Sequence, residues 1–131
     1  MKRPTHIRVF VLAAVAAALV CLVGAASAVA VKRASTTSTL VFKSPNNFSG
    51  DLSSKNKRCI GQRLVNLYYL GPSGMSSPQF VEAAQTDSTG HFEINSIPDA
   101  VAGNYDISIT KRKIKKANLL CKAFVSAQYT F

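Results

Sequence analysis

The chain has 131 residues, which suffices for a single domain and excludes a large multidomain protein. Its 16 lysines and arginines outnumber its 6 aspartates and glutamates, and the net charge of +10 favours anionic partners over cationic ones. Hydrophobic residues make up 47% of the chain, but one apolar block near the N-terminus supplies part of that fraction.

The N-terminal residues have the pattern of a secretory signal peptide. Lys2, Arg3 and Arg8 give a positively charged start, and an almost wholly apolar stretch follows them. Ala26-Ser27-Ala28 then supplies the small residues of a cleavage site. We therefore expect residues 1–28 to form a hydrophobic signal helix that is removed on export, which leaves a secreted protein.

An uncleaved membrane anchor is the alternative for the same segment. Residues 9–31 carry no charge, and 23 residues at 1.5 Å per residue in a helix are enough to cross a bilayer. The basic N-terminal flank places the rest of the chain outside the cell in either case. The alternative is therefore a membrane-anchored protein whose folded domain lies outside, and only this alternative implies contact with the membrane.

A short polar stretch follows the apolar segment. Residues 29–38 are rich in serine and threonine and lack a hydrophobic period, which predicts a flexible linker. The folded domain is then expected at residues 39–131. Cleavage after Ala28 removes three basic residues and no acidic ones, so the net charge falls from +10 to +7.

Two cysteines, Cys59 and Cys121, lie beyond the N-terminal segment. An even pair in an exported chain predicts a disulfide, and two buried free thiols are the alternative. The bridge would close a loop of about 60 residues, for which the chain-entropy model gives roughly 4 kcal/mol. We expect no metal and no cofactor, because two isolated cysteines and a single histidine supply too few ligands.

Short apolar runs separated by turn signals fill the rest of the chain, and none has the length and period of a sizeable helix. Alternation is clearest at Tyr105, Ile107 and Ile109, while residues 63–70 are apolar on both sides and are expected to form a central strand. The pattern predicts an all-β fold, a seven-stranded antiparallel Greek-key β-sandwich. Its strands are expected at residues 39–43, 48–53, 63–70, 79–85, 90–95, 104–110 and 119–131.

A tight hairpin is predicted between the fourth and fifth of these strands. Asp87 is a turn former whose carboxylate usually bonds nearby backbone N–H groups, and Gly90 can adopt the positive φ that the corner needs. Phe92 and Ile94 then share one face of the following strand. In the last strand, one face is expected to carry Cys121, Ala123, Val125, Ala127 and Tyr129.

Several motifs of the sequence have to be considered together: Phe48-x-Gly50-x-Leu52-Ser53, Cys59-x3-Arg63-x-Val65-x-Leu67-Tyr68, Thr86-Asp87-Ser88-x-Gly90-x-Phe92, Gly103-x-Tyr105 and Cys121. These motifs are similar to those of a known family. Residues 40–131 resemble small secreted domains of the carboxypeptidase-regulatory-like, transthyretin (prealbumin)-like β-sandwich superfamily, and most closely its short exported forms in actinobacteria. The resemblance implies a transthyretin-like or immunoglobulin-like sandwich that serves as an adhesive, carrier or appended module.

Catalytic motifs are absent from the sequence. His91 is the only histidine beyond the N-terminal segment, and it follows the turn glycine on the expected solvent face. On paper, Ser88 or Ser96 could join His91 and either Asp87 or Asp99 in a Ser-His-Asp site. However, neighbours along a hairpin seldom converge, and no Gly-x-Ser-x-Gly elbow is present. We therefore expect a non-enzymatic protein in which His91 is a solvated hairpin residue.

One basic run stands out among the polar residues. It lies between the last two predicted strands, where it is either a solvated hairpin tip that discourages edge-to-edge association or a patch for an anionic partner. Lys55, Lys57 and Arg58 form a second, smaller basic cluster. Specific nucleic-acid recognition is not expected, because no reader motif is present. The run consists of Lys111, Arg112, Lys113, Lys115 and Lys116.

The sequence thus favours extracellular binding or structural support at the cell envelope. The expected partner of the basic run is an anionic cell-wall polymer, an acidic polysaccharide or another extracellular protein. The alternative is a carbohydrate- or small-ligand-binding module that uses exposed aromatic side chains, for which Tyr68, Phe80 and Phe124 are the candidates. Binding measured at low and at high salt distinguishes the two functions, because salt screens contacts between charges but not the stacking of aromatic rings.

Overall fold

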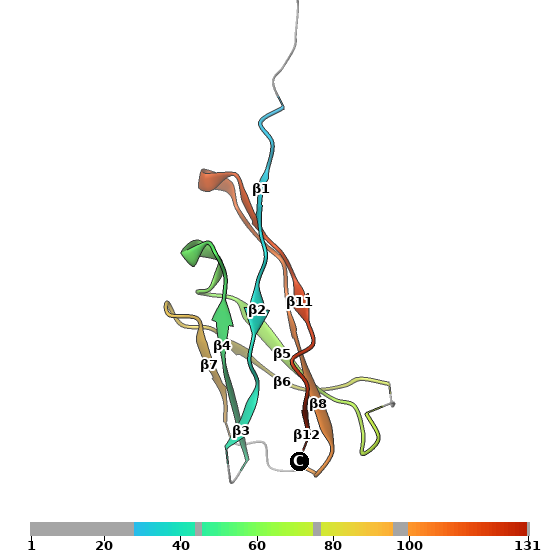
Figure 1. Ribbon diagram of the computed structural model, residues 1–131. Coiled ribbons are helices and arrows are strands. Elements are labelled where there is room, and N and C mark those ends of the chain that lie inside the picture. The colour runs from blue at the N-terminus through green and yellow to red at the C-terminus, as the bar shows by residue number, and fades with distance from the viewer. Residues whose placement is uncertain (1–27, 44–45, 75–76, 96–99, 131) are drawn as a thin grey trace, which may run out of the picture.

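A computed structural model of the chain describes residues 28–43, 46–74, 77–95 and 100–130 (Figure 1). The predicted signal helix and most of the alternative anchor fall in residues 1–27, outside the described residues. The described chain consists of short strands and two single 3₁₀ turns. The strands are β1 (Lys32–Ala34), β2 (Thr37–Ser38), β3 (Val41–Lys43), β4 (Asn47–Ser53), β5 (Leu64–Tyr69), β6 (Gln79–Gln85), β7 (His91–Ile94), β8 (Asn104–Ile109), β9 (Arg112–Ile114), β10 (Leu119–Cys121), β11 (Phe124–Val125) and β12 (Tyr129–Thr130), and the turns are η1 (Lys57–Cys59) and η2 (Lys115–Ala117).

Two antiparallel sheets share the main hydrophobic core. In one, β2 and β3 pair with one edge of β4, and β7 pairs with the other edge. In the other, the order is β11-β8-β5-β6, and β12 also pairs with β8. The chain is therefore all-β, as predicted, in an arrangement consistent with a β-sandwich. The buried core residues are Leu40, Phe48, Leu52, Phe92 and Ile94 from the first sheet and its connection, and Val65, Leu67, Tyr105, Ile107 and Ile109 from the second.

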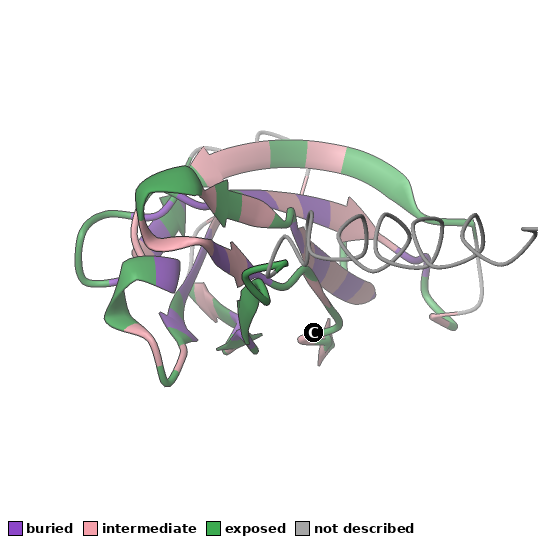
Figure 2. Cartoon of the chain, turned by 90° about the horizontal axis from the view of Figure 1, so that it is seen from above, coloured by how far each residue is buried: buried purple, intermediate pink, exposed green. Residues whose placement is uncertain are grey.

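The hydrophobic alternation of the sequence accounts for this core. Buried and half-buried residues alternate along β8, and the buried ones, such as Ile107, face the core. Figure 2 shows this kind of alternation along a strand inside the molecule. β5 lies between β6 and β8, as its apolar character on both faces predicted. Aromatic rings join the two sheets, since the ring centroids of Phe48 and Tyr105 are 4.7 Å apart.

Gly50 of β4 leaves the space that the Phe92 ring occupies. The two residues are paired across β4 and β7, and a Cβ added at Gly50 would lie 2.6 Å from Phe92 Cζ and closer still to the carbonyl oxygen of Thr39. We expect Gly50→Ala to lower the free energy of unfolding by about 1–3 kcal/mol, because the core cannot yield without strain. Urea unfolding measures this change, and an unaltered midpoint would contradict the packing described.

The segment predicted to be a flexible linker is instead part of the fold. β1 pairs in parallel with β10, β2 pairs with β4, and both Ala34 of β1 and Thr36 between β1 and β2 are buried. Strands of two or three residues are too short to show a hydrophobic period, and small side chains can be buried without one. The folded domain therefore begins by Lys32 rather than at residue 39.

The end of the chain differs from the prediction as well. The basic run was expected to lie in a loop between the last two predicted strands, but Arg112–Ile114 is the strand β9, which pairs with β10. The single strand expected at residues 119–131 is divided into β10, β11 and β12. After β10 the alternation changes phase, so that Val125 is 65% exposed while Phe124 packs against the core. Ser126, with φ of 93°, interrupts the strand again.

A third, smaller sheet with the order β1-β10-β9 lies at one end of the molecule. It has a separate small core in which the predicted disulfide between Cys59 and Cys121 is present, with Cα atoms 5.4 Å apart and a sequence separation of 62. Ala34 and Leu119 complete the buried part of this core. The bridge thus attaches η1 to β10. We call this part of the molecule, made of β1, η1, β9, η2 and β10, the basic end.

No helix in the described part of the chain has the length and apolarity needed to cross a membrane.

Candidate functional site: the basic end

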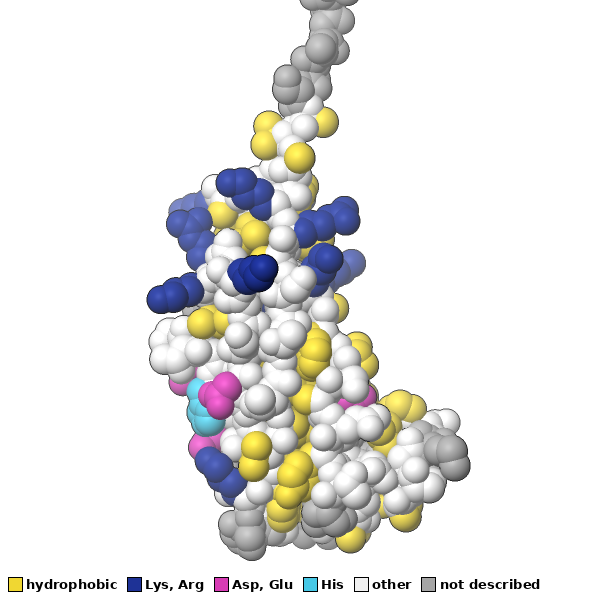
Figure 3. Space-filling model, viewed as in Figure 1, with side chains coloured by type: hydrophobic (Ala, Val, Ile, Leu, Met, Phe, Trp, Pro, Cys, Tyr) yellow, Lys and Arg dark blue, Asp and Glu magenta, His cyan; other side chains and the backbone are white. Residues whose placement is uncertain are grey.

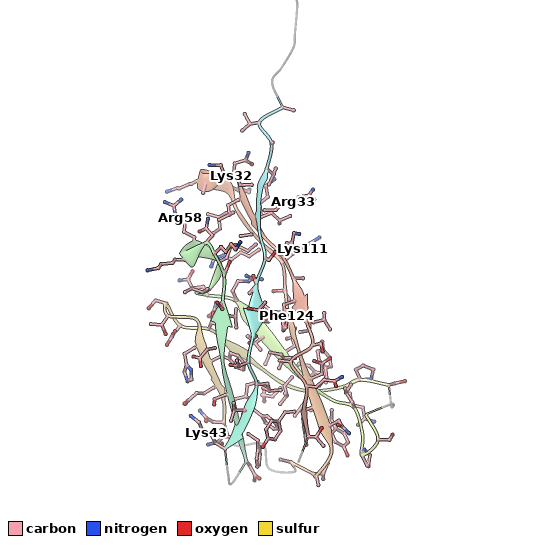
Figure 4. The ribbon with its side chains drawn as sticks, in the orientation of Figure 1. Lys32, Arg33, Lys43, Arg58, Lys111 and Phe124 are labelled. Atoms are coloured by element: carbon pink, nitrogen blue, oxygen red, sulfur yellow. A yellow bond between two sulfur atoms is a disulfide. The ribbon has the colours of Figure 1, made fainter. Side chains whose placement is uncertain are left out.

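Lysine and arginine side chains gather around the basic end (Figure 3). Lys32, Arg33, Arg58 and Lys111 lie there together although they are far apart in sequence, whereas Lys43 lies at the opposite end of the molecule (Figure 4). The pairing of β1 and β9 with β10, and the disulfide to η1, bring these segments together. The two basic clusters of the sequence therefore form one surface, to which β1 adds a third group of charges.

The charges of the basic end have no acidic partner among the described residues. The described residues contain two ion pairs, and both involve His91 rather than a lysine or arginine. No described lysine or arginine nitrogen lies within 4.0 Å of a described carboxylate oxygen. Like charges on one surface repel one another, so folding concentrates positive potential at this end instead of neutralising it.

Arg112 is the most fixed member of the predicted basic run. Its Nη1 donates to the carbonyl oxygen of Gly61 at 2.7 Å, and its Nη2 donates to Oε1 of Gln62 at 3.2 Å. Arg112 is half-buried, while Lys111 and Lys113 on either side are exposed. The strand β9 thus holds one guanidinium against the turn after η1 and leaves its neighbours in solvent.

Arg63 is a buried residue of this end to which the sequence analysis assigned no role. Its side chain is 1% exposed, and its guanidinium donates to backbone carbonyls and one hydroxyl, with no carboxylate among its partners. Its position two residues before Val65 puts it on the inner face of that strand, which is the signal that could have identified it. The acceptors are Thr110 O at 3.2 and 2.7 Å, Cys59 O at 2.7 Å, Lys122 O at 2.8 Å and Thr36 Oγ1 at 3.1 Å.

The hydrogen bonds of Arg63 connect the segments that build the basic end. Its partners belong to the β1–β2 connection, to η1, to the end of β8 and to the chain after β10. Burial lowers the pKa of Arg63, and the nearby charge of Arg112 lowers it further. An arginine stays charged despite such a shift, so Arg63 adds a fixed positive charge beneath this surface.

A groove of about 550 Å³ opens between η1 and β9. Lys57 and Arg58 line it from η1, and Arg112 and Ile114 line it from β9. Asp87 is the one acidic residue among the described residues of the lining. Gly61, Gln62, Thr86 and Ser88 complete the lining. Three cationic side chains from two distant parts of the sequence thus share one open depression.

A second groove, of about 430 Å³, lies beside β1. Lys32 and Arg33 line it from the strand, and Lys55 and Asn56 line it from the segment just before η1. The hydroxyl of Ser54 donates to the carbonyl oxygen of Ser35 at 2.7 Å, which holds that segment against the chain after β1. The two grooves are therefore lined by adjoining parts of the segment 55–58, and both are basic.

Asp87 and Gly90 form the corner between β6 and β7. Oδ1 of Asp87 accepts hydrogen bonds from the backbone N–H and hydroxyl of Thr89 and from the backbone N–H of His91, at 2.7–3.0 Å. The Thr89 hydroxyl is the main reason why the pKa of Asp87 is lowered. Gly90 has φ of 93°, a conformation that favours glycine. The carboxylate thus holds the turn next to the first groove.

His91 lies between two carboxylates on the outer face of β4 and β7. Its Nδ1 is 2.8 Å from Oδ1 of Asp51, and its Nε2 is 3.4 Å from Oε1 of Glu93. The contact with Asp51, followed by that with Glu93, raises the pKa of His91. No described serine hydroxyl bonds to the ring, so His91, Ser88 and Asp87 do not form a Ser-His-Asp site. The alternative members Ser96 and Asp99 lie outside the described residues.

The raised pKa predicts how His91 affects stability with pH. The folded protein holds the proton more tightly than the unfolded chain, so the contribution is fully present below pH about 6.5 and is lost as pH rises through the folded-state pKa. The stability advantage of the wild-type protein over His91→Gln should therefore shrink from about pH 5 to about pH 9. Urea unfolding of both proteins measures it, and an advantage that grows with pH would contradict the ion pairs.

The exposed aromatic candidates lie elsewhere on the molecule. Phe80 of β6 is 59% exposed, and its ring meets that of Tyr68 edge to face with centroids 6.0 Å apart. Phe124, which the sequence analysis expected to face outward, packs against the main core because the alternation changes phase after β10. In the described part of the chain, no group of three or more His, Cys, Asp or Glu residues is placed to hold a metal ion.

Comparison with known proteins adds no relative to this description. A scan against protein-family models, a search of curated proteins and a search of solved structures each found no match to the chain. The functional argument therefore depends on the geometry and charge of the basic end.

Proposed function

We propose that this protein is an exported, non-enzymatic β-sandwich module that binds anionic polymers at the cell envelope through its basic end. The observation that carries the proposal is the concentration of lysine and arginine at one end of the molecule, where no described carboxylate pairs with them. Several segments are brought together to form this surface, and a disulfide and a buried arginine fix them. A merely solvated loop needs no such support.

Binding by this surface is electrostatic in character. A group of cations on one surface attracts an anionic polymer over a distance of about 8 Å at physiological salt and releases the counterions that the polymer had held. The side chains of the basic run are mostly exposed and need little rearrangement to reach their partner. Such contacts favour a repeating polymer of uniform charge over one defined small ligand.

The path of the chain supports a location at the cell surface. Residues 28–31, which precede β1, lead into the fold at the basic end (Figure 1). If residues 1–28 are cleaved, the new α-amino group adds a positive charge at this end. If residues 9–31 remain as an anchor, the basic end is the part of the domain nearest the membrane and the envelope polymers around it.

The resemblance to transthyretin-like secreted domains is part of the same proposal. Two interrupted strands support it: β2 and β3 lie along one side of β4, and β11 and β12 lie along one side of β8. Counting each of these pairs as one strand gives seven strands for a Greek-key sandwich. The small basic sheet is then an addition to that framework, and it is the part to which we assign binding.

Co-sedimentation tests the proposed function. The oxidised protein is mixed with isolated cell envelope and with neutral insoluble polysaccharides, each at low and at about 1 M salt, where the Debye length shrinks to about 3 Å. We expect binding to the envelope at low salt only. Binding that persists at high salt, or that favours the neutral polysaccharide, would contradict the proposal.

Carbohydrate binding through aromatic side chains is the second candidate. The exposure of Phe80 beside Tyr68 favours it, since stacked rings at the surface can bind sugars. The salt-resistant outcome above would support it, and Phe80→Ala would then abolish binding while neutralisation of the basic run would not.

A further inference from the structure

We propose that the groove between η1 and β9 is a binding site for a phosphoryl group. The inference rests on the proposed function and adds a defined position and a ligand chemistry to it. The basic end would then attract a phosphate-bearing polymer with its whole charge and hold one phosphate of that polymer in this groove.

The cations of the groove are arranged on both of its sides. Lys57 and Arg58 come from η1, and Arg112 comes from β9, so an anion in the groove meets positive charge from two directions. Both elements are fixed, because Cys59 of η1 is bound to Cys121 of β10 and β9 pairs with β10. A ligand therefore does not have to order a loose chain, which lowers the cost of binding.

Arg112 is held in place by hydrogen bonds that do not use all of its N–H donors. Two of its hydrogen bonds go to Gly61 O and Gln62 Oε1, while a guanidinium has five N–H donors in one plane. No described carboxylate pairs with it. A planar, fixed guanidinium with unused donors is suited to two-point contact with a phosphate.

Buried charge next to the groove increases its affinity for anions. Arg63 follows Gly61 and Gln62 of the groove in the chain, and all its donors are directed to the protein, so it cannot contact a ligand. Its charge remains without an acidic partner and lies near Arg112, whose repulsion lowers the pKa of Arg63. An anion in the groove would relieve this repulsion.

The single acid of the groove does not cancel this charge. Three cationic side chains outnumber Asp87, and its Oδ1 is engaged by three hydrogen bonds within the hairpin turn. A phosphoryl group presents more oxygens and more charge than a carboxylate, so it can be shared among Lys57, Arg58 and Arg112. Ile114 offers an apolar wall for the carbon atoms next to the phosphate.

Amide chemical-shift mapping tests the site directly. The ¹⁵N-labelled, oxidised protein is titrated with inorganic phosphate, with tripolyphosphate and with long-chain polyphosphate. We expect all three to shift the amides of Gly61, Gln62, Ser88 and Ile114 first, with affinity rising with chain length. Shifts spread evenly over the lysines of the basic end would overturn the site, and so would shifts produced by inorganic phosphate alone.

Two variants with equal loss of charge separate the groove from the surface around it. Lys57→Gln with Arg58→Gln removes two charges from the groove, and neither side chain makes a hydrogen bond or ion pair with another described residue. Lys113→Gln with Lys116→Gln removes two exposed charges outside it. We expect the first pair to weaken tripolyphosphate binding roughly tenfold and the second pair to weaken it less than threefold.

The same two variants distinguish failure of the site from failure of the proposed function. If both pairs weaken the binding of long polyphosphate equally and tripolyphosphate does not bind, the groove site is overturned while the basic end remains a polyanion surface. If long polyphosphate does not bind the wild-type protein at all, the site and the proposed function both fail. Amide spectra of the free variants confirm that each is folded.

Discussion

Replacing Arg63 by methionine is expected to lower the free energy of unfolding by roughly 3–5 kcal/mol, a large share of the 5–15 kcal/mol that stabilises an ordinary domain. The methionine fills much of the same volume but leaves the carbonyls of Cys59, Thr110 and Lys122 without their donor. Each polar group left unpaired in a buried place costs about 1–3 kcal/mol. Urea unfolding of the oxidised protein measures the change.

Two further variants make this result specific. Arg63→Lys keeps the charge but offers one compact ammonium in place of five planar donors, so it should recover only a part of the loss. Arg33→Met is the matched control, because Arg33 on β1 is exposed, and it should change stability by no more than about 0.5 kcal/mol. Equal unfolding midpoints for Arg63→Met and Arg33→Met would show that Arg63 does not hold the basic end together.

Neutralising the basic run by glutamine at five positions is expected to weaken binding to long-chain polyphosphate by roughly 100- to 1,000-fold at low salt. A basic residue close to an anionic surface contributes about 1 kcal/mol, and some of the five side chains point away from any one polymer chain. Fluorescence anisotropy with labelled polyphosphate measures the affinity. The positions are Lys111, Arg112, Lys113, Lys115 and Lys116.

A control variant tests whether the position of the charge matters for binding, and not only the amount of charge. Lys43 lies at the opposite end of the molecule, so Lys43→Gln should change the affinity less than twofold (Figure 4). An unfolding curve of the five-residue variant checks that its loss of binding does not come from loss of the fold. If Lys43→Gln weakened binding as much as Lys113→Gln does, net charge alone would explain the interaction.

The parts of the fold that the sequence predicts are those with a local signal. β8 and β7 alternate over enough residues to show a period of two, and the turn at Asp87 and Gly90 contains the residues that its geometry needs. The even pair of cysteines predicted the disulfide because an exported chain favours one. In each case the physical cause of the structure lies in a few neighbouring residues or in the type of residue present.

The parts that were missed depend on long-range pairing. β1 has three residues, and only its contact with β10 makes it a strand, so a polar segment looked like a linker. β9 becomes a strand for the same reason, since its sequence is mostly charged. The acceptors of Arg63 are mostly backbone carbonyls, which every residue has. No sequence pattern therefore indicates that these carbonyls surround one guanidinium.

The salt dependence of polyphosphate binding tests the central claim most directly, because it counts the charges that take part. The affinity of the oxidised wild-type protein is measured by anisotropy from about 50 to about 200 mM salt. If the basic end binds a polyanion, the logarithm of the affinity falls linearly with the logarithm of the salt concentration, by roughly one unit per neutralised phosphate and with a slope of about −4 or steeper. A slope near zero would show that the lysines and arginines gathered at this end do not bind anionic polymers.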